Sequence, residues 1–73
     1  MDRAMRFHLS FDYEARPAHR SSGDQVVIAD DIEGAARQIA RERNVTSIHI
    51  RKRFRLGEPA SAAEVIDRDF EFA

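Results

Sequence analysis

Apolar and polar residues alternate along the first segment of the chain, residues 5–15. The apolar positions are Met5, Phe7, Leu9, Phe11 and Tyr13. A period of two with aromatic enrichment predicts a strand that buries one face. The turn-forming residues gathered at 16–24 then predict a loop. The short apolar run at 25–29, QVVIA, predicts a second strand that pairs with the first as a hairpin.

The period changes to that of a helix in the segment DDIEGAARQIARERN, residues 30–44. Its apolar stripe consists of Ile32, Ala35, Ala36, Ile39 and Ala40. This stripe is predicted to face a sheet, and its small alanines allow a close approach. Asp30 or Asp31 can cap the first turn, and Asp30 with Glu33 has the spacing of a capping box. Asn44 suits a left-handed cap at the other end.

Alternation returns in TSIHIRKRFRLG, residues 46–57, which predicts a third strand. One face is expected to carry Ile48, Ile50, Phe54 and Leu56, interrupted by Lys52. The other face is expected to carry His49, Arg51, Arg53 and Arg55.

The last segment, EVIDRDFEFA at 64–73, alternates again and predicts a fourth strand. Ile66, Phe70 and Phe72 share one face with Arg68, and the opposite face carries Val65, Asp67, Asp69 and Glu71. Because Ser61 and Glu64 also have capping-box spacing, a short helical turn at 61–66 is the competing prediction. The expected fold is α+β: a ββαββ chain in which one helix packs on one face of a four-stranded, mostly antiparallel sheet.

Length and composition narrow the class of protein. The 73 residues are expected to form a single domain, 1–73, and an apolar share of 42% suits a folded one. The absence of cysteine excludes disulfides, zinc–thiolate sites and cysteine nucleophiles. No apolar run is long enough to span a membrane or form a signal peptide, so a cytoplasmic protein of a bacterial host cell is expected.

The basic third strand raises the question of nucleic-acid binding. If the last two strands form a hairpin around residue 60, Arg53 faces Asp67, Arg51 faces Asp69 and His49 faces Glu71. A slip of one residue would turn acids toward the core, whereas a slip of two keeps the same faces. Opposed unlike charges favour a salt-bridged face over an open phosphate-binding patch.

Candidate chemistry is sparse. His8 and His49 are expected on the open face, but a metal site needs three or four converging ligands, so no metal is expected. The serines lack a nucleophile motif, and the glycines stand alone without forming a phosphate loop. The acidic pair Asp30–Asp31 is explained by helix capping. The protein is therefore expected to be non-enzymatic, without catalytic residues or cofactors.

The stretch VVIADDIEGAARQIARE, followed by the strand SIHIRKRF, resembles small phage-encoded anti-CRISPR proteins that act on type I systems. The similarity is one of layout and covers about residues 5–56. It implies a protein that binds the multi-subunit crRNA-guided surveillance complex and blocks target DNA. Related inhibitors use basic side chains to occupy the DNA path, and others use acidic surfaces as DNA mimics.

The leading hypothesis is an inhibitor of this kind, with a protein or ribonucleoprotein partner and no membrane association. The alternatives are a small nucleic-acid-binding module that uses the Arg-rich strand, which would bind directly but weakly, and a small phage structural or assembly protein. The oligomeric state, monomer or dimer, stays open. The expected partner-binding residues are Arg6, Arg16, Arg20, Arg51, Arg53 and Arg55.

Overall fold

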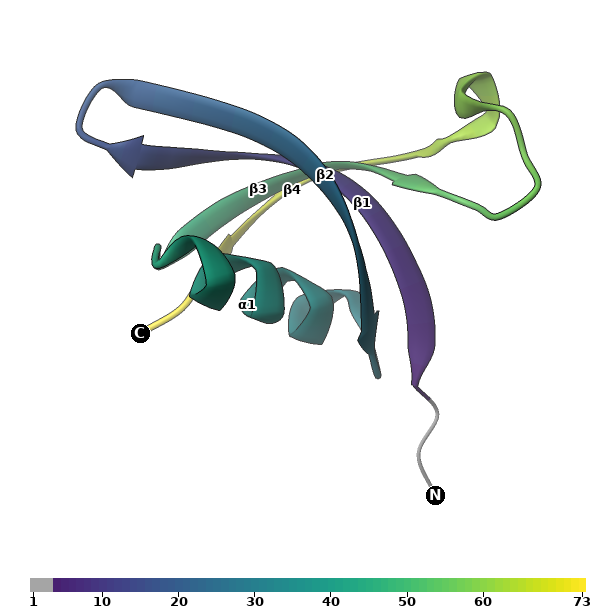
Figure 1. The fold of residues 1–73 in the computed structure, drawn as a ribbon, viewed down its shortest axis with the longest axis horizontal. Coiled ribbons are helices and arrows are strands. Elements are labelled where there is room, and N and C mark those ends of the chain that lie inside the picture. The colour runs from purple at the N-terminus through teal and green to yellow at the C-terminus, as the bar shows by residue number, and fades with distance from the viewer. Residues whose placement is uncertain (1–3) are drawn as a thin grey trace.

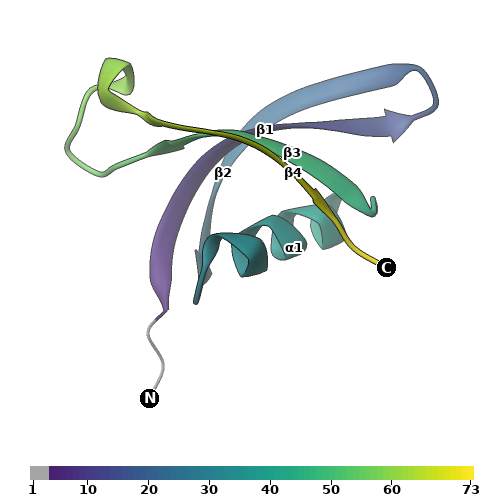
Figure 2. The ribbon, with the colours of Figure 1, turned by 180° about the vertical axis from the view of Figure 1, so that it is seen from behind.

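The computed structural model describes residues 4–73, which form a four-stranded antiparallel sheet and one helix. The elements are β1 (Met5–Arg16), β2 (His19–Ala29), α1 (Ile32–Arg43), β3 (Ser47–Phe54), a short 3₁₀ turn (Ala60–Ala62) and β4 (Glu64–Glu71). The strand order is β2-β1-β3-β4, so α1 crosses over β1 between β2 and β3. The sheet curls over the helix, which lies on its concave side (Figures 1 and 2). The predicted α+β class is confirmed.

The helix forms as its sequence predicts. Asp31 is the N-cap, and its carboxylate accepts a hydrogen bond of 2.8 Å from the backbone N–H of Gly34. The Asp30–Glu33 capping box is therefore not the one used. Asn44 ends the helix in the left-handed conformation, at φ 59°. No helix within residues 4–73 is long and apolar enough to cross a membrane.

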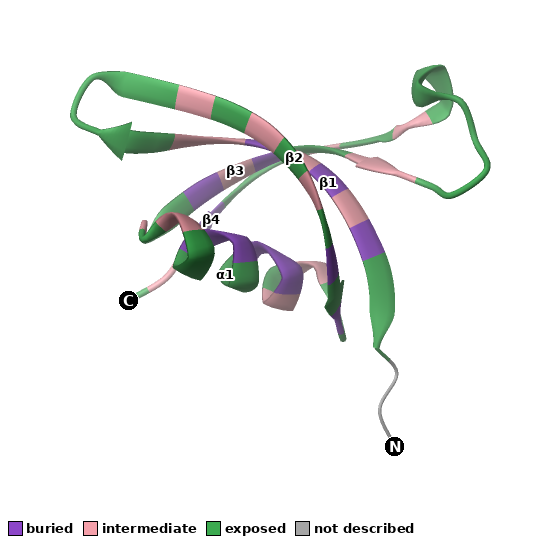
Figure 3. Ribbon diagram, viewed as in Figure 1, coloured by how far each residue is buried: buried purple, intermediate pink, exposed green. Residues whose placement is uncertain are grey.

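The core lies between the helix and the concave face of the sheet (Figure 3). Phe7, Leu9 and Phe11 of β1 form its centre, and each is at most 2% exposed. The other buried residues are Val27, Ala29, Ala35, Ala36, Ile39, Ala40, Ile48, Ile50 and Phe70. Ile32, Ile66 and Phe72 pack against this cluster. The predicted helix stripe and the predicted faces of β1 and β4 are thus confirmed.

The predicted loop at 16–24 is wrong. β1 and β2 stay paired as far as Arg16 and His19, and only Pro17 and Ala18 form the turn. Pro17 has a fixed φ, and Ala18 adopts a left-handed φ of 65°, so two residues are enough to reverse the chain. The hairpin continues beyond the helix as an arm (Figure 1), where both faces meet solvent and no apolar pattern is required.

A β-bulge corrects the prediction for β3. The adjacent residues Ser10 and Phe11 of β1 pair with Lys52 and Ile50, which leaves Arg51 as an extra residue. An extra residue shifts all later side chains to the opposite face. Phe54 therefore lies opposite His8 on the convex face, while Arg53 lies opposite buried Leu9 on the helix side.

The register of β3 with β4 also differs from the prediction. His49 faces Asp69 in place of Glu71, a slip of two residues that preserves the faces. Beyond the bulge Arg53 faces Glu64, not Asp67, and Ile66 and Asp67 together lie opposite Arg51. Asp67 takes a left-handed φ of 47°, the strained residue of this second irregularity. The competing helical turn at 61–66 is replaced by the 3₁₀ turn and by a strand that begins at Glu64.

Candidate functional site: the open face of the sheet

The convex side of the sheet, opposite α1, is the surface on which most exposed polar strand residues gather; we call it the open face. Its residues follow from the pairing of the strands, because every second residue of β1 and β2 points away from the helix. β1 contributes Arg6, His8, Ser10, Asp12 and Glu14, and β2 contributes Arg20, Ser22, Asp24, Val26 and Ile28. β3 and β4 add His49, Arg51, Lys52, Phe54, Val65, Asp67, Asp69 and Glu71.

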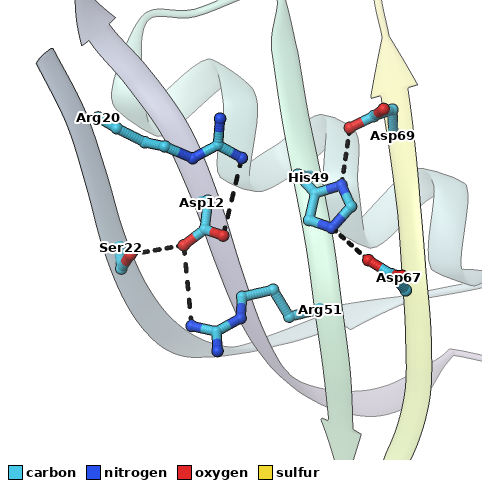
Figure 4. Close-up of polar contacts among 7 residues, drawn as sticks. All are labelled: Asp12, Arg20, Ser22, His49, Arg51, Asp67 and Asp69. Carbon is cyan, nitrogen blue, oxygen red and sulfur yellow. Dashed lines mark hydrogen bonds and ion pairs between the residues drawn. The ribbon is translucent and has the colours of Figure 1, made fainter.

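Asp12 is the acidic centre of this face. Its side chain is only 15% exposed, and its two oxygens lie 3.8 Å from the Arg20 guanidinium and 3.9 Å from that of Arg51. The hydroxyl of Ser22 donates a hydrogen bond to the same carboxylate. These contacts bring together three strands, as Figure 4 shows. Asp12 therefore neutralises two of the arginines that the sequence offered for partner binding.

His49 lies directly opposite Asp12 across β1 and β3 and is held by two acids of β4. Its Nδ1 lies 2.7 Å from Asp69 and its Nε2 lies 2.8 Å from Asp67 (Figure 4). The hydrogen bond to Asp69 raises the pKa of His49 most, desolvation opposes it, and the bond to Asp67 raises it further. In the protonated form of His49 both ring nitrogens donate, one to each of these carboxylates.

A row of apolar side chains crosses the other end of the open face. Val26 pairs with His8, and His8 pairs with Phe54, whose ring centroid lies 4.9 Å from that of His8. Ile28 lies next to Val26 on the same face of β2 and is 56% exposed, while Val26 is 45% exposed. We call Val26, Ile28 and Phe54, together with the His8 ring that lies between Val26 and Phe54, the apolar strip.

The predicted partner-binding residues do not form one surface. Arg6 and Arg51 are on the open face, and Arg20 lies beside Asp12. Arg16 lies at the tip of the hairpin, opposite His19.

The other two predicted residues leave the open face. The bulge turns Arg53 to the helix side, where its guanidinium lies 4.5 Å above the ring of Phe7. Arg55 follows the end of β3 and pairs with Glu64 at 3.0 Å.

Sequence reasoning missed the apolar strip. The alternation in QVVIA could have revealed it, since Val27 and Ala29 face the core and so leave Val26 and Ile28 on the other side. The position of Phe54 could not have been found without the bulge. The two histidines share the open face as expected, but they do not converge: His8 pairs with Asp24 at 3.4 Å and His49 with the acids of β4.

Within residues 4–73 no group of three or more His, Asp or Glu residues could hold a metal ion. An open hollow on this face is lined by Asp12, Arg20, His49, Arg51, Lys52, Val65 and Asp67. Its charged groups other than Lys52 are already paired with acidic or basic neighbours, which suits surface recognition better than acid–base chemistry. The chain matches no protein-family model, and it has no significant match among curated proteins or among solved structures.

Proposed function

We propose that this protein is a non-enzymatic interaction protein that binds a larger protein or ribonucleoprotein through the open face of its sheet. The observation that supports this most is the apolar strip. Val26 and Ile28 are about half exposed, and Phe54 lies on the same side, although the core has room for apolar residues only on the concave side. Apolar side chains gathered on an otherwise charged surface are typical of a contact site.

The surroundings of the strip resemble the rim of an interface. Arg6 lies opposite Ile28. Asp24 and Lys52 lie on either side of Ser10, because each is paired with it across the sheet. Protein interfaces commonly have an apolar centre and a polar, solvent-accessible rim. The hydrogen bonds of His49 to Asp67 and Asp69 would restrict these side chains before a partner arrives, which would lower the entropy lost on binding.

The partner that we propose is a type I crRNA-guided surveillance complex, which the protein would inhibit by blocking access of target DNA. This part of the proposal rests on the layout resemblance to type I anti-CRISPR proteins. The convex face suits it, because a convex surface can enter a channel that otherwise holds a nucleic acid. Blocking such a channel requires no catalytic group.

Direct binding to nucleic acid has less support. The basic residues of β3 are split between the two sides of the sheet, and Arg51 has an acidic partner. Arg55, which follows the strand, also has one. A phosphate-binding surface relies on clustered cations that can replace counterions. A protein surface is thus the better match for the open face.

The test is binding to a purified type I surveillance complex, compared between the wild type and Ile28→Asp. Ile28→Asp places a charge in the apolar strip without touching the core, and Val65→Asp is the matched control because Val65 is exposed on the same face near the opposite edge. We expect the wild type and Val65→Asp to bind and to protect phage in an interference assay. Ile28→Asp should bind about tenfold or more weakly, as expected for loss of a buried interface anchor.

Circular dichroism should show that both variants keep the wild-type fold. Wild-type protein that neither binds the complex nor inhibits interference would contradict the proposed partner. Equal binding by the wild type and Ile28→Asp would contradict the proposed surface.

A further inference from the structure

The outer edge of β2 is a long strand edge with a self-complementary charge pattern. β2 pairs with β1 on one side, and no other strand within residues 4–73 pairs with its outer side. The helical end of this edge is occupied, because the Gln38 side chain donates a hydrogen bond of 2.7 Å to the carbonyl of Ile28. The other half, His19–Asp24, belongs to the arm that extends past the helix (Figure 1). An uncovered strand edge is a template for another strand.

The Gln38 contact also shows which residues of β2 point their backbone groups outward. The Ile28 carbonyl is turned to the free edge, and in an antiparallel ladder both backbone groups of every second residue share that direction. The register of β1 with β2 has no shift between Ala29 and Arg20, so the alternation continues along the arm. The outward residues are therefore Arg20, Ser22, Asp24, Val26 and Ile28.

We propose that a second copy of this chain pairs with β2, antiparallel and two-fold symmetric about Ser22. In this register Arg20 lies opposite Asp24 of the second copy, and Asp24 lies opposite its Arg20. Both pairs join outward-facing residues, so they coincide with backbone hydrogen-bonded pairs. The two side chains are accessible to a second copy, because Arg20 is 68% exposed and Asp24 is 66% exposed, although Arg20 also pairs with Asp12 at 3.8 Å and Asp24 with His8 at 3.4 Å. The two sheets would become one sheet of eight strands.

Charge selects this register among its neighbours. A shift of two residues in one direction places Arg20 opposite Val26, and a shift in the other direction places it opposite Ser22. A larger shift places Asp24 opposite itself, where like charges repel. Only the register centred on Ser22 joins both unlike pairs.

The other edge of the sheet is not suited to self-pairing. β4 carries Glu64, Asp67, Asp69 and Glu71 against a single Arg68, so two copies of it would oppose acids to acids. The left-handed Asp67 also interrupts its backbone alternation. Self-association is therefore assigned to β2, and it leaves the apolar strip on the open face accessible to another partner.

A charge-swap experiment tests the proposal. The interface is small, so the wild type is expected to be a weak dimer, measured by sedimentation equilibrium into the high micromolar range. Arg20→Asp and Asp24→Arg each replace both unlike pairs by like pairs, and each should weaken self-association about tenfold or more. Mixing the two variants should restore the dimer as a heterodimer, because their charges complement each other. The double variant R20D/D24R should again form a homodimer.

Arg6→Asp is the matched control, since it makes the same charge change on the open face of the inner strand β1 and should leave the dimer intact. Two results would overturn the proposal. One is a wild type that stays monomeric over the whole concentration range. The other is a pair of single variants that dimerise as well as the wild type or fail to recombine when mixed.

Discussion

At the scale of single residues, the open face is organised by two oppositely charged centres that face each other. Asp12 gathers two guanidiniums, and His49 gathers two carboxylates. Each such contact on a strand surface contributes little alone, roughly 0.2–1 kcal/mol. Together they hold side chains from all four strands in one pattern. The charges that looked like a binding stripe in the sequence therefore act first on each other.

The two bonds to His49 predict a pH-dependent contribution to stability. The pKa of His49 is raised in the folded protein, chiefly by Asp69 and then by Asp67, so the folded state binds the proton more tightly than the unfolded state does. The resulting stabilisation is fully present below the unfolded pKa of about 6.5 and is lost as pH rises through the raised folded pKa. His49→Gln should therefore lower the free energy of unfolding more at about pH 5.5 than at about pH 8.5.

Urea denaturation of the wild type and His49→Gln at both pH values measures this difference. His19→Gln is the control, because His19 lies at the exposed tip of the hairpin and forms no ion pair with any residue from 4 to 73. It should change the free energy of unfolding little at either pH, since an exposed residue at the hairpin tip makes few contacts. An equal loss of stability at both pH values for His49→Gln would show that the imidazolium form is not what the two acids stabilise.

At the scale of elements, the sequence predicted the elements that bury apolar residues in the core and missed the strand pairing that does not involve the core. The helix stripe around Ile39, with its caps at Asp31 and Asn44, follows directly from spacing and residue type. The sequence predicts a loop at 16–24 because the strands of the hairpin arm are stabilised by backbone pairing and not by buried apolar residues. Turn-forming residues such as Gly23 gave no sign of this pairing.

The bulge at Arg51 limited the prediction of the candidate site. Strict alternation assigned Phe54 to the core and Arg53 to the open face, and one extra residue reverses both assignments. The residue pattern marks a bulge only weakly, since Arg51, Lys52 and Arg53 are all basic. The faces before the bulge, at Ile48 and Ile50, were predicted correctly.

The bulge predicts that the same substitution in β3 lowers the free energy of unfolding by different amounts at Ile50 and at Phe54. Ile50→Ser removes a fully buried side chain and buries a hydroxyl, and it should lower the free energy of unfolding by about 3 kcal/mol or more. Phe54→Ser acts on the open face and should cost about 1 kcal/mol or less. Chemical denaturation of both variants measures the contrast. A similar large loss for both would mean that Phe54 belongs to the core and that the bulge is absent.

At the scale of the whole molecule, the charges nearly cancel, with a formal net charge of −1. The overall dimensions of 36 × 33 × 16 Å describe a thin body, so most residues of the sheet are close to solvent on at least one side. A thin, nearly neutral protein has little long-range attraction for phosphate. The proposed recognition of a partner would then rely on the shape and local chemistry of a face, such as the apolar strip.

Neutralisation by Asp12 gives the last prediction. Asp12→Asn keeps the size of the side chain but releases the charges of Arg20 and Arg51, which point to the same face as Lys52. Affinity for random duplex DNA should rise, with a steeper dependence on salt, because the released arginines can displace counterions from phosphate. Asp30→Asn is the matched control, since it makes the same charge change at the exposed start of the helix. Salt titrations of the three proteins against one duplex provide the measurement. Tight binding by the wild type at physiological salt would refute the neutralisation and make nucleic acid the leading partner, whereas an equal gain for Asp30→Asn would reduce the effect to net charge alone.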